Sequence, residues 1–181
     1  MQVRRLEGDQ ARRSELLRCF KSGEFDAVHY AGHAFFDRDA PSRSGILCSG
    51  REVLSGADLA GIGNLPSLVF FNACEVGRIR KRGDHNGSAA PAPELLRRNV
   101  GFAEAFLRGG IANFIGTYWP VDDAAAGTFA PSFYEGLLAG KSLAEALMSS
   151  RRVLQQAKLG DWADYILYGD PGFVMKRGPQ A

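Results

Sequence analysis

Two residues that could form a hydrolytic site come at the ends of strand-like segments. Cys74 lies in FFNACEVG at 70–77, just after an apolar run, and His33 lies in HYAGHA at 29–34. A thiol attacks as its thiolate, which is scarce near neutral pH unless a base favours it. An imidazole beside Cys74 would be that base and would later protonate a leaving amine.

Backbone amides could complete such a site. The N–H groups around Gly32, His33 and Cys74 emerge from strand ends and could bind the oxyanion of a tetrahedral intermediate. The alternative is packing, because cysteine is among the most buried residue types and FFNA is an apolar neighbourhood. Taken alone, the position of Cys74 favours packing.

The segment that begins at Cys74 also matches a short phosphatase motif. The stretch CEVGRIR at 74–80 has a cysteine, five residues and an arginine, the spacing of the phosphate cradle in cysteine phosphatases. In this chain Glu75 would stand inside the cradle and repel a phosphate, and no Ser or Thr follows Arg80. We interpret the match as accidental.

The other histidines and cysteines fit structural or solvent-exposed roles. His29 is expected to be a core or surface histidine, and His85 to be solvated. Cys19 falls on the apolar face of a predicted helix and Cys48 follows an edge-strand pattern, so both are expected to pack. With no CxxC and no ligand-like spacing of histidine and cysteine, no metal site is predicted, and no cofactor.

The composition is that of a soluble globular protein. The chain has 181 residues, 45% of them hydrophobic, which suits one domain over 1–181. A net charge of +2 is too small to indicate nucleic acid or membrane binding. No apolar run is long enough to span a membrane, and the N-terminus is no signal peptide. The odd count of three cysteines favours reduced thiols in the cytoplasm.

The elements that would position Cys74 and His33 alternate between strand and helix. Strands are predicted at 3–6, 26–31, 45–47, 68–72 and 112–118, with a last strand and turn within 164–173. Helices are predicted at 10–21, 101–108, 124–138 and 142–157, with a helical turn at 59–62. This pattern indicates an α/β fold with a mainly parallel sheet and helices on both faces. In such sheets ligands bind outside the carboxyl ends of the strands, where both residues fall.

The segment 77–99 differs from the rest of the chain. It holds six basic residues among Gly, Ser, Ala and Pro, which predicts an exposed flexible loop, although 94–98 could begin a helix. The basic residues are Arg78, Arg80, Lys81, Arg82, Arg97 and Arg98.

Nearly the whole chain, from 3 to 173, resembles the CHAT domain of the caspase, separase and gingipain group of cysteine peptidases. The blocks that carry the resemblance are FDAVHYAGHA, SGILCSGREVLSGADL, LVFFNACEVG, GFAEAFLRGGIANFIGTYWPVDDAAAGTFAPSFYEGLLAGKSLAEAL and YILYGDPGF. The resemblance implies a caspase-like fold with Cys74 as nucleophile and His33 as base. The related peptidases usually have glycine after the histidine, with an amide that helps to hold the oxyanion. Here that residue is Ala34, which keeps the N–H but does not easily take a positive φ.

The resemblance also implies a specificity pocket. The stretch WPVDD at 119–123 is similar to the separase segment in which an aspartate lines the primary pocket, so Asp122 and Asp123 could bind Arg or Lys of a substrate. The alternative is that one of them caps the helix expected near 124.

The resulting expectation is a cytoplasmic cysteine endopeptidase that cleaves a protein substrate after a basic residue. Family members are commonly fused to helical repeats, which implies an activating or regulatory partner of that type, and some serve in defence. They also tend to begin further upstream, which implies a domain shortened at its N-terminus or part of a larger protein. The alternative is a catalytically weak CHAT module that serves protein interaction. No direct nucleic-acid or membrane partner is expected.

Overall fold

The computed structural model describes residues 2–35, 37, 39–73, 92–117 and 121–175. Their main feature is a four-stranded sheet in the order β1-β5-β6-β7. β1, β5 and β6 run parallel, and β7 pairs antiparallel with β6. The bounds are Ala27–Gly32 for β1, Leu68–Ala73 for β5, Asn113–Thr117 for β6 and Tyr165–Tyr168 for β7. The predicted mainly parallel sheet is confirmed.

A smaller antiparallel sheet continues from the end of β1. It consists of β2 (Ala34–Phe35), β3 (Gly45–Leu47) and β4 (Val53–Ser55). His33 is the single residue between β1 and β2. The histidine therefore stands at the junction of the two sheets, where the chain leaves the carboxyl end of β1.

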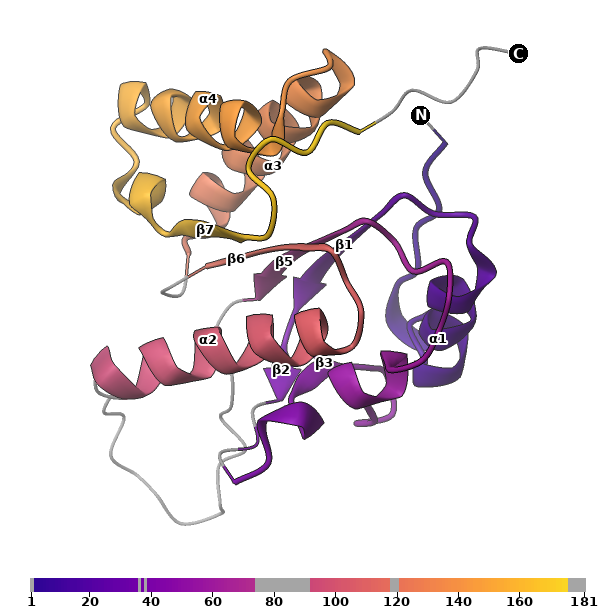
Figure 1. The fold of residues 1–181 in the computed structure, drawn as a ribbon. Coiled ribbons are helices and arrows are strands. Elements are labelled where there is room, and N and C mark those ends of the chain that lie inside the picture. The colour runs from indigo at the N-terminus through magenta and orange to yellow at the C-terminus, as the bar shows by residue number, and fades with distance from the viewer. Residues whose placement is uncertain (1, 36, 38, 74–91, 118–120, 176–181) are drawn as a thin grey trace.

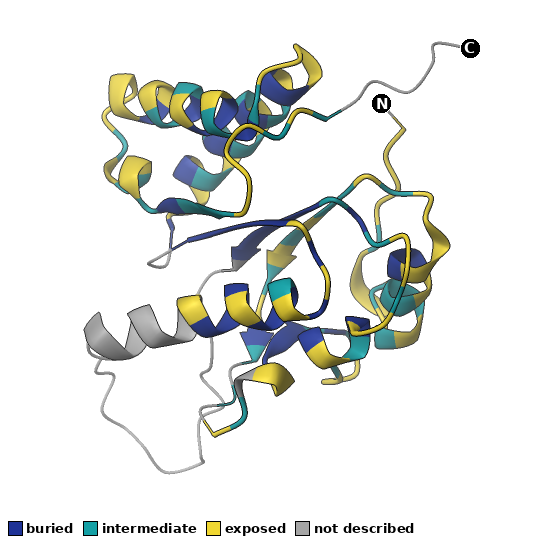
Figure 2. Ribbon diagram, viewed as in Figure 1, coloured by how far each residue is buried: buried dark blue, intermediate teal, exposed yellow. Residues whose placement is uncertain are grey.

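Helices cover both faces of the larger sheet, as predicted (Figure 1). α1 (Arg13–Ser22) and α2 (Ala92–Arg108) lie on one face, while α3 (Asp123–Leu138) and α4 (Leu143–Gln156) lie on the other. Side chains alternate along the strands, so that Phe71 packs toward α2 and Phe70 toward α3. Figure 2 shows the sheet-facing sides of α3 and α4 as buried.

Local signals at the helix ends account for several boundaries. Gly23 ends α1 with a left-handed φ of 70°, which a side chain would disfavour. At the start of α4, the Glu145 N–H donates to Ser142 Oγ over 3.3 Å and the Ser142 N–H donates to Glu145 Oε2 over 2.9 Å. This reciprocal pair confirms the N-cap predicted at Ser142.

The structure corrects three local predictions. Residues 92–99, predicted as part of the basic loop, belong to α2, whose first turn contains Pro93, where an absent N–H costs nothing. Val3–Leu6 lies in no strand, and the two short strands β2 and β4 were not predicted. The remaining loop residues, 77–91, lie outside the described part. Among the described helices, none has the length and apolar character needed to cross a bilayer.

Candidate active site

The carboxyl ends of β1 and β5 lie side by side. The two strands pair in parallel along their full length, and the last pair in the register is Gly32 with Ala73. His33 follows Gly32 in the chain, and Cys74 follows Ala73. Cys74 lies outside the described residues. The structure therefore places side by side the two strand ends that immediately precede His33 and Cys74.

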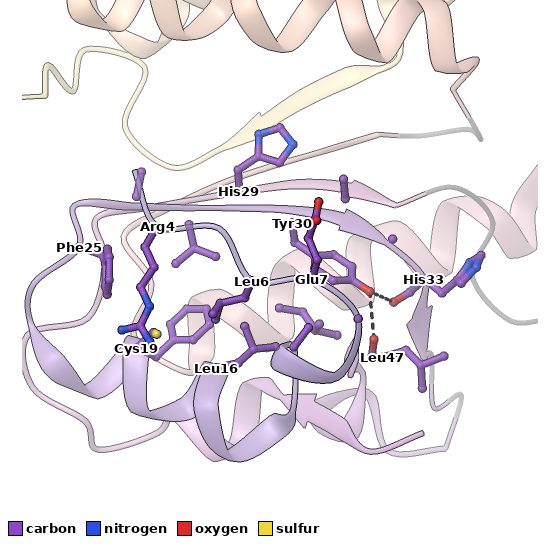
Figure 3. A pocket seen from close by; sticks show the side chains of 18 residues that line it. Arg4, Leu6, Glu7, Leu16, Cys19, Phe25, His29, Tyr30, His33 and Leu47 are labelled. Atoms are coloured by element: carbon purple, nitrogen blue, oxygen red, sulfur yellow. Dashed lines mark hydrogen bonds between the residues drawn. The ribbon is translucent and has the colours of Figure 1, made fainter. Parts of the chain in front are cut away.

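The main chain of His33 is held from two sides. Its carbonyl oxygen accepts a hydrogen bond from the Tyr30 hydroxyl at 2.5 Å and another from the Leu47 N–H at 3.0 Å. The Tyr30 hydroxyl also lies 3.1 Å from the Leu47 carbonyl oxygen. Figure 3 shows this hydroxyl between the ends of β1 and β3. The side chain of His33 is exposed, so the backbone is fixed while the imidazole is accessible.

Tyr30 is itself well anchored. Its ring stacks on Phe71 with centroids 5.2 Å apart, and its side chain is half-buried. Burial raises the pKa of the phenol to about 12. The hydroxyl therefore keeps its proton across the physiological pH range and remains a donor to the His33 carbonyl.

Gly32 leaves the space that Tyr30 needs. A Cβ atom on Gly32 would lie 2.6 Å from the Tyr30 hydroxyl oxygen, closer than non-bonded atoms approach. Beyond His33, Ala34 is 3% exposed and pairs with Ile46 in β2. Ala34 is not among the described non-glycine residues with a positive φ. Whether the Gly32, Ala34 and Cys74 amides bind an oxyanion stays a prediction.

The two candidate specificity residues have different surroundings. Asp122 is the N-cap of α3, and its Oδ1 accepts a hydrogen bond from the Ala124 N–H at 2.8 Å. The expectation that one aspartate caps this helix is therefore confirmed for Asp122. Asp123 lies in the first turn and is exposed, and we find no hydrogen bond or ion pair of its carboxylate within the described part of the chain. Binding of a basic substrate residue by either one stays a prediction.

Two further aspartates, missed in the sequence, belong to the same region. Asp161 Oδ2 accepts a hydrogen bond from the Asp122 N–H at 2.8 Å, across 39 positions of sequence. Burial, and then the charge of Asp161, raise the pKa of Asp164 above its ordinary value. The start of α3 is therefore an acidic neighbourhood.

A cavity borders the histidine on the α1 side of β1. It has a volume of about 490 Å³, and its lining is mainly apolar, with His33 at one end (Figure 3). Leu16, Phe20, Val28, Tyr30 and Leu47 are among the residues that line it. The end of β1, where His33 lies, thus borders an apolar recess.

The side chains predicted to pack do so. Cys19 and Cys48 are 8% and 5% exposed. The His29 ring stacks on Phe70 with centroids 4.7 Å apart, and its Nδ1 lies 3.1 Å from the Tyr134 hydroxyl. His29 is nevertheless exposed at the surface of β1, and the partial desolvation of its ring by its aromatic neighbours lowers its pKa, which favours the neutral ring. His85 lies outside the described residues. Across the described ranges, His, Cys, Asp and Glu side chains form no group of three that could hold a metal ion.

Asn72 is a further residue that the sequence did not single out. It is the last residue but one of β5 and is 9% exposed, yet its Oδ1 has no hydrogen-bond partner among the described residues. The available signal was a polar residue at the end of an otherwise apolar strand. The sequence around Tyr30 carries a weaker signal, because the contacts of Tyr30 depend on the distant strand β3.

Comparison with known families gives one result. The model of the CHAT domain family matches residues 1–170. A search of curated proteins found no match. The match covers most of the 181 residues, and the fold has the mainly parallel sheet flanked by helices that such a domain requires. The chain therefore belongs to the CHAT domain family, a caspase-like family.

Proposed function

We propose that the protein is a cysteine endopeptidase in which Cys74 is the nucleophile and His33 the general base. The observation that carries this proposal is the register of the parallel strands. Gly32 is the partner of Ala73, and the next residues in sequence are His33 and Cys74. Adjacent strands lie about 5 Å apart, a separation over which an imidazole and a thiol can share a proton.

The reaction follows from ordinary thiol chemistry. The Cys74 thiol gives its proton to the His33 imidazole, and the thiolate sulfur forms a bond to the carbonyl carbon of the substrate peptide. The carbon–nitrogen bond then breaks as the imidazolium protonates the leaving amine. Water, deprotonated by the same imidazole, hydrolyses the thioester and restores the thiol.

The clamp on the His33 main chain supports this role. A general base must be held within about 0.5 Å of its working position, and hydrogen bonds from neighbouring residues supply such restraint. Here Tyr30 and Leu47 both bond to the His33 carbonyl. A surface histidine without function would gain little from two such bonds, one of which requires glycine at position 32.

For specificity, we propose that the acidic start of α3 receives an Arg or Lys side chain of the substrate. Asp123 has the freer carboxylate, whereas one oxygen of Asp122 is used by the helix cap. A guanidinium would also be attracted by Asp161, which bonds to the Asp122 N–H. We also propose that the enzyme stays inactive until a partner of helical-repeat type activates it.

The alternative is a CHAT module that binds proteins and has little activity. One observation favours it: Ala34, at the position of the usual glycine, is buried in the small sheet and paired with Ile46. An oxyanion site that needs a positive φ at this residue would not form.

Labelling by a peptidyl electrophile separates the two functions without requiring knowledge of the substrate. We expect a peptidyl acyloxymethyl ketone ending in Arg to add once to the wild type, at Cys74, as read by intact mass and peptide mapping. His33→Ala should slow the labelling by about 100-fold or more, because the base is lost. His29→Ala is the matched control, since it removes a histidine from the same strand. Labelling at the same rate in His33→Ala and His29→Ala would contradict the dyad.

A further inference from the structure

Asn72 places an unsatisfied acceptor at the carboxyl end of β5. Its side chain is more than nine-tenths buried, and its Oδ1 has no partner among the described residues. Buried amide oxygens in native proteins nearly always accept a hydrogen bond, because an unpaired one has lost its water without compensation. Among the described residues, such an atom indicates a donor that does not reach it in this arrangement.

The register with β1 gives one candidate for that donor. Asn72 pairs with Ala31, two residues before His33. Side chains alternate along a strand, so Asn72 shares the face of Phe70, on the α3 side, and position 31 shares the face of His29. Ala31 has only a methyl group there. The next position on that face of β1 is 33, diagonal to Asn72 at a Cα separation of about 8 Å, a distance that an imidazole and an amide can bridge.

We propose that Asn72 is a positioning residue of the active site, whose Oδ1 accepts a hydrogen bond from one ring N–H of His33 when substrate is bound. This inference rests on the proposed Cys–His dyad. The bond would direct the other ring nitrogen toward the Cys74 thiol and would stabilise the imidazolium formed when the thiol is deprotonated. An acceptor-only atom suits a group that is an N–H donor in its neutral and its protonated forms.

The chain provides a matched control in a second buried strand asparagine. Asn113, at the start of β6, is 1% exposed, and both its side-chain nitrogen and its side-chain oxygen are hydrogen-bonded. Its Nδ2 donates to the Ser67 carbonyl at 3.0 Å, and its Oδ1 accepts from the Asp170 N–H at 2.9 Å. Asn113 therefore shows what a structural asparagine does in this fold, whereas the Asn72 oxygen has no partner in the part of the chain that the structure describes.

The test measures inactivation of Cys74 by iodoacetate as a function of pH, with the adduct located by peptide mapping. Iodoacetate is an anion and is attracted by a nearby imidazolium. The rate at which it alkylates Cys74 therefore falls at alkaline pH, where the imidazolium loses its proton. We expect Asn72→Ala to move this alkaline limb to lower pH, and Asn72→Asp to move it up by about one unit, because a carboxylate stabilises the imidazolium. Asn113→Ala should leave the limb where it is. The other titratable groups are His29 and Tyr30 on β1, and Tyr134 of α3 and Tyr165 of β7, which pack against the same face of the sheet. Burial raises the pKa of Tyr30 and of Tyr134, so both stay neutral, and the series is repeated in His29→Gln.

The melting temperature distinguishes a positioning role from a structural one, because loss of a structural side chain lowers the Tm. Asn72→Ala should keep or raise the Tm while lowering the inactivation rate at neutral pH about tenfold, whereas Asn113→Ala should lower the Tm and leave the rate unchanged. An unshifted alkaline limb in both Asn72 variants would overturn the role of Asn72 and leave the dyad standing. A wild-type profile identical to that of His33→Ala would overturn the dyad, and the role of Asn72 with it.

Discussion

The Tyr30 hydroxyl and the His33 carbonyl oxygen lie 2.5 Å apart, so a side chain of β1 holds the residue that links β1 to β2. The same hydroxyl reaches the Leu47 carbonyl in β3, and the Leu47 N–H bonds to His33. One phenol thus links the large parallel sheet to the small antiparallel sheet at the residue proposed as the catalytic base. This relationship determines how the site should respond to substitution.

Tyr30→Phe should impair activity more than stability. The variant keeps the ring that stacks on Phe71 and loses only the hydroxyl, so the free energy of unfolding should fall by about 1 kcal/mol. The His33 backbone gains freedom, and we expect kcat to fall about tenfold with KM nearly unchanged, since positioning mainly affects the reacting geometry. Steady-state kinetics and urea denaturation would check both values. Wild-type kcat in a variant with reduced stability would show that the hydroxyl is only structural.

Gly32→Ala should have the larger effect. The added methyl group would lie 2.6 Å from the Tyr30 hydroxyl oxygen, so the ring must move and the bonds to His33 and Leu47 must lengthen or break. We expect a loss of stability of about 1 to 3 kcal/mol, as in other overpacked sites, and a loss of activity at least as great as in Tyr30→Phe. The double variant Tyr30→Phe/Gly32→Ala should recover part of the stability, because the clashing oxygen is gone. Failure of the second substitution to relieve the first would exclude this clash as the cause.

The fold was predictable from the sequence where signals are local. The apolar runs of β5 and β6, the glycine that ends α1 and the Ser142–Glu145 cap all depend on neighbours within a few residues. The start of α2 was missed because a segment rich in Ala, Pro and Arg resembles a loop, although Pro is well accepted in the first turn of a helix. The short strand β4 exists only because it pairs with β3.

The candidate site was predictable only in part, because several of its contacts join residues far apart in the sequence. The strand-end position of His33 follows from its place after an apolar run. The roles of Tyr30 and Asp161 depend on partners 17 and 39 positions away, Leu47 and Asp122, and no local pattern encodes such contacts. Asp122 and Asp123 are adjacent in sequence, and only the geometry of the α3 N-terminus distinguishes cap from free carboxylate.

The stability of the protein should rise between acid and neutral pH through His29. Burial lowers the pKa of His29 in the folded state below its ordinary value of 6.5. Between those two values the unfolded chain binds more protons, so the free energy of unfolding increases with pH and levels off above about pH 7. We expect His29→Gln to flatten the dependence of Tm on pH from 5 to 7.5. Tyr134→Phe is the control, because it removes the hydrogen bond and keeps the titrating ring; a flat wild-type profile would contradict the assignment.

Asp122 and Asp123 should separate helix capping from substrate selection. Asp122→Ala should cost about 1 kcal/mol of stability, while Asp122→Asn should cost much less, because Asn caps helices as well as Asp. Asp123→Asn should leave stability unchanged and reduce the preference for Arg over Leu before the scissile bond by about tenfold, since a charged hydrogen bond is lost. The ratio of kcat/KM for paired Arg and Leu peptides measures this preference. Equal cleavage of the two peptides by the wild type would remove both aspartates from the specificity site.

Self-processing, if the protease accepts basic residues, should be confined to one part of the basic segment. Arg97 and Arg98 lie within α2, and a peptidase binds its substrate in extended form, so a cut there requires unwinding of the helix. Arg78, Arg80, Lys81 and Arg82 precede the helix by ten positions or more, so cleavage after them leaves α2 intact. We expect intact-mass analysis of the incubated wild type to show cuts after residues 78–82 and none after 97 or 98. Cys74→Ala is the control for a contaminating protease, and should show neither. Fragments ending at Arg97 or Arg98 in the wild type alone would mean that the first turns of α2 open readily in solution, and identical fragments in both proteins would end the self-processing hypothesis.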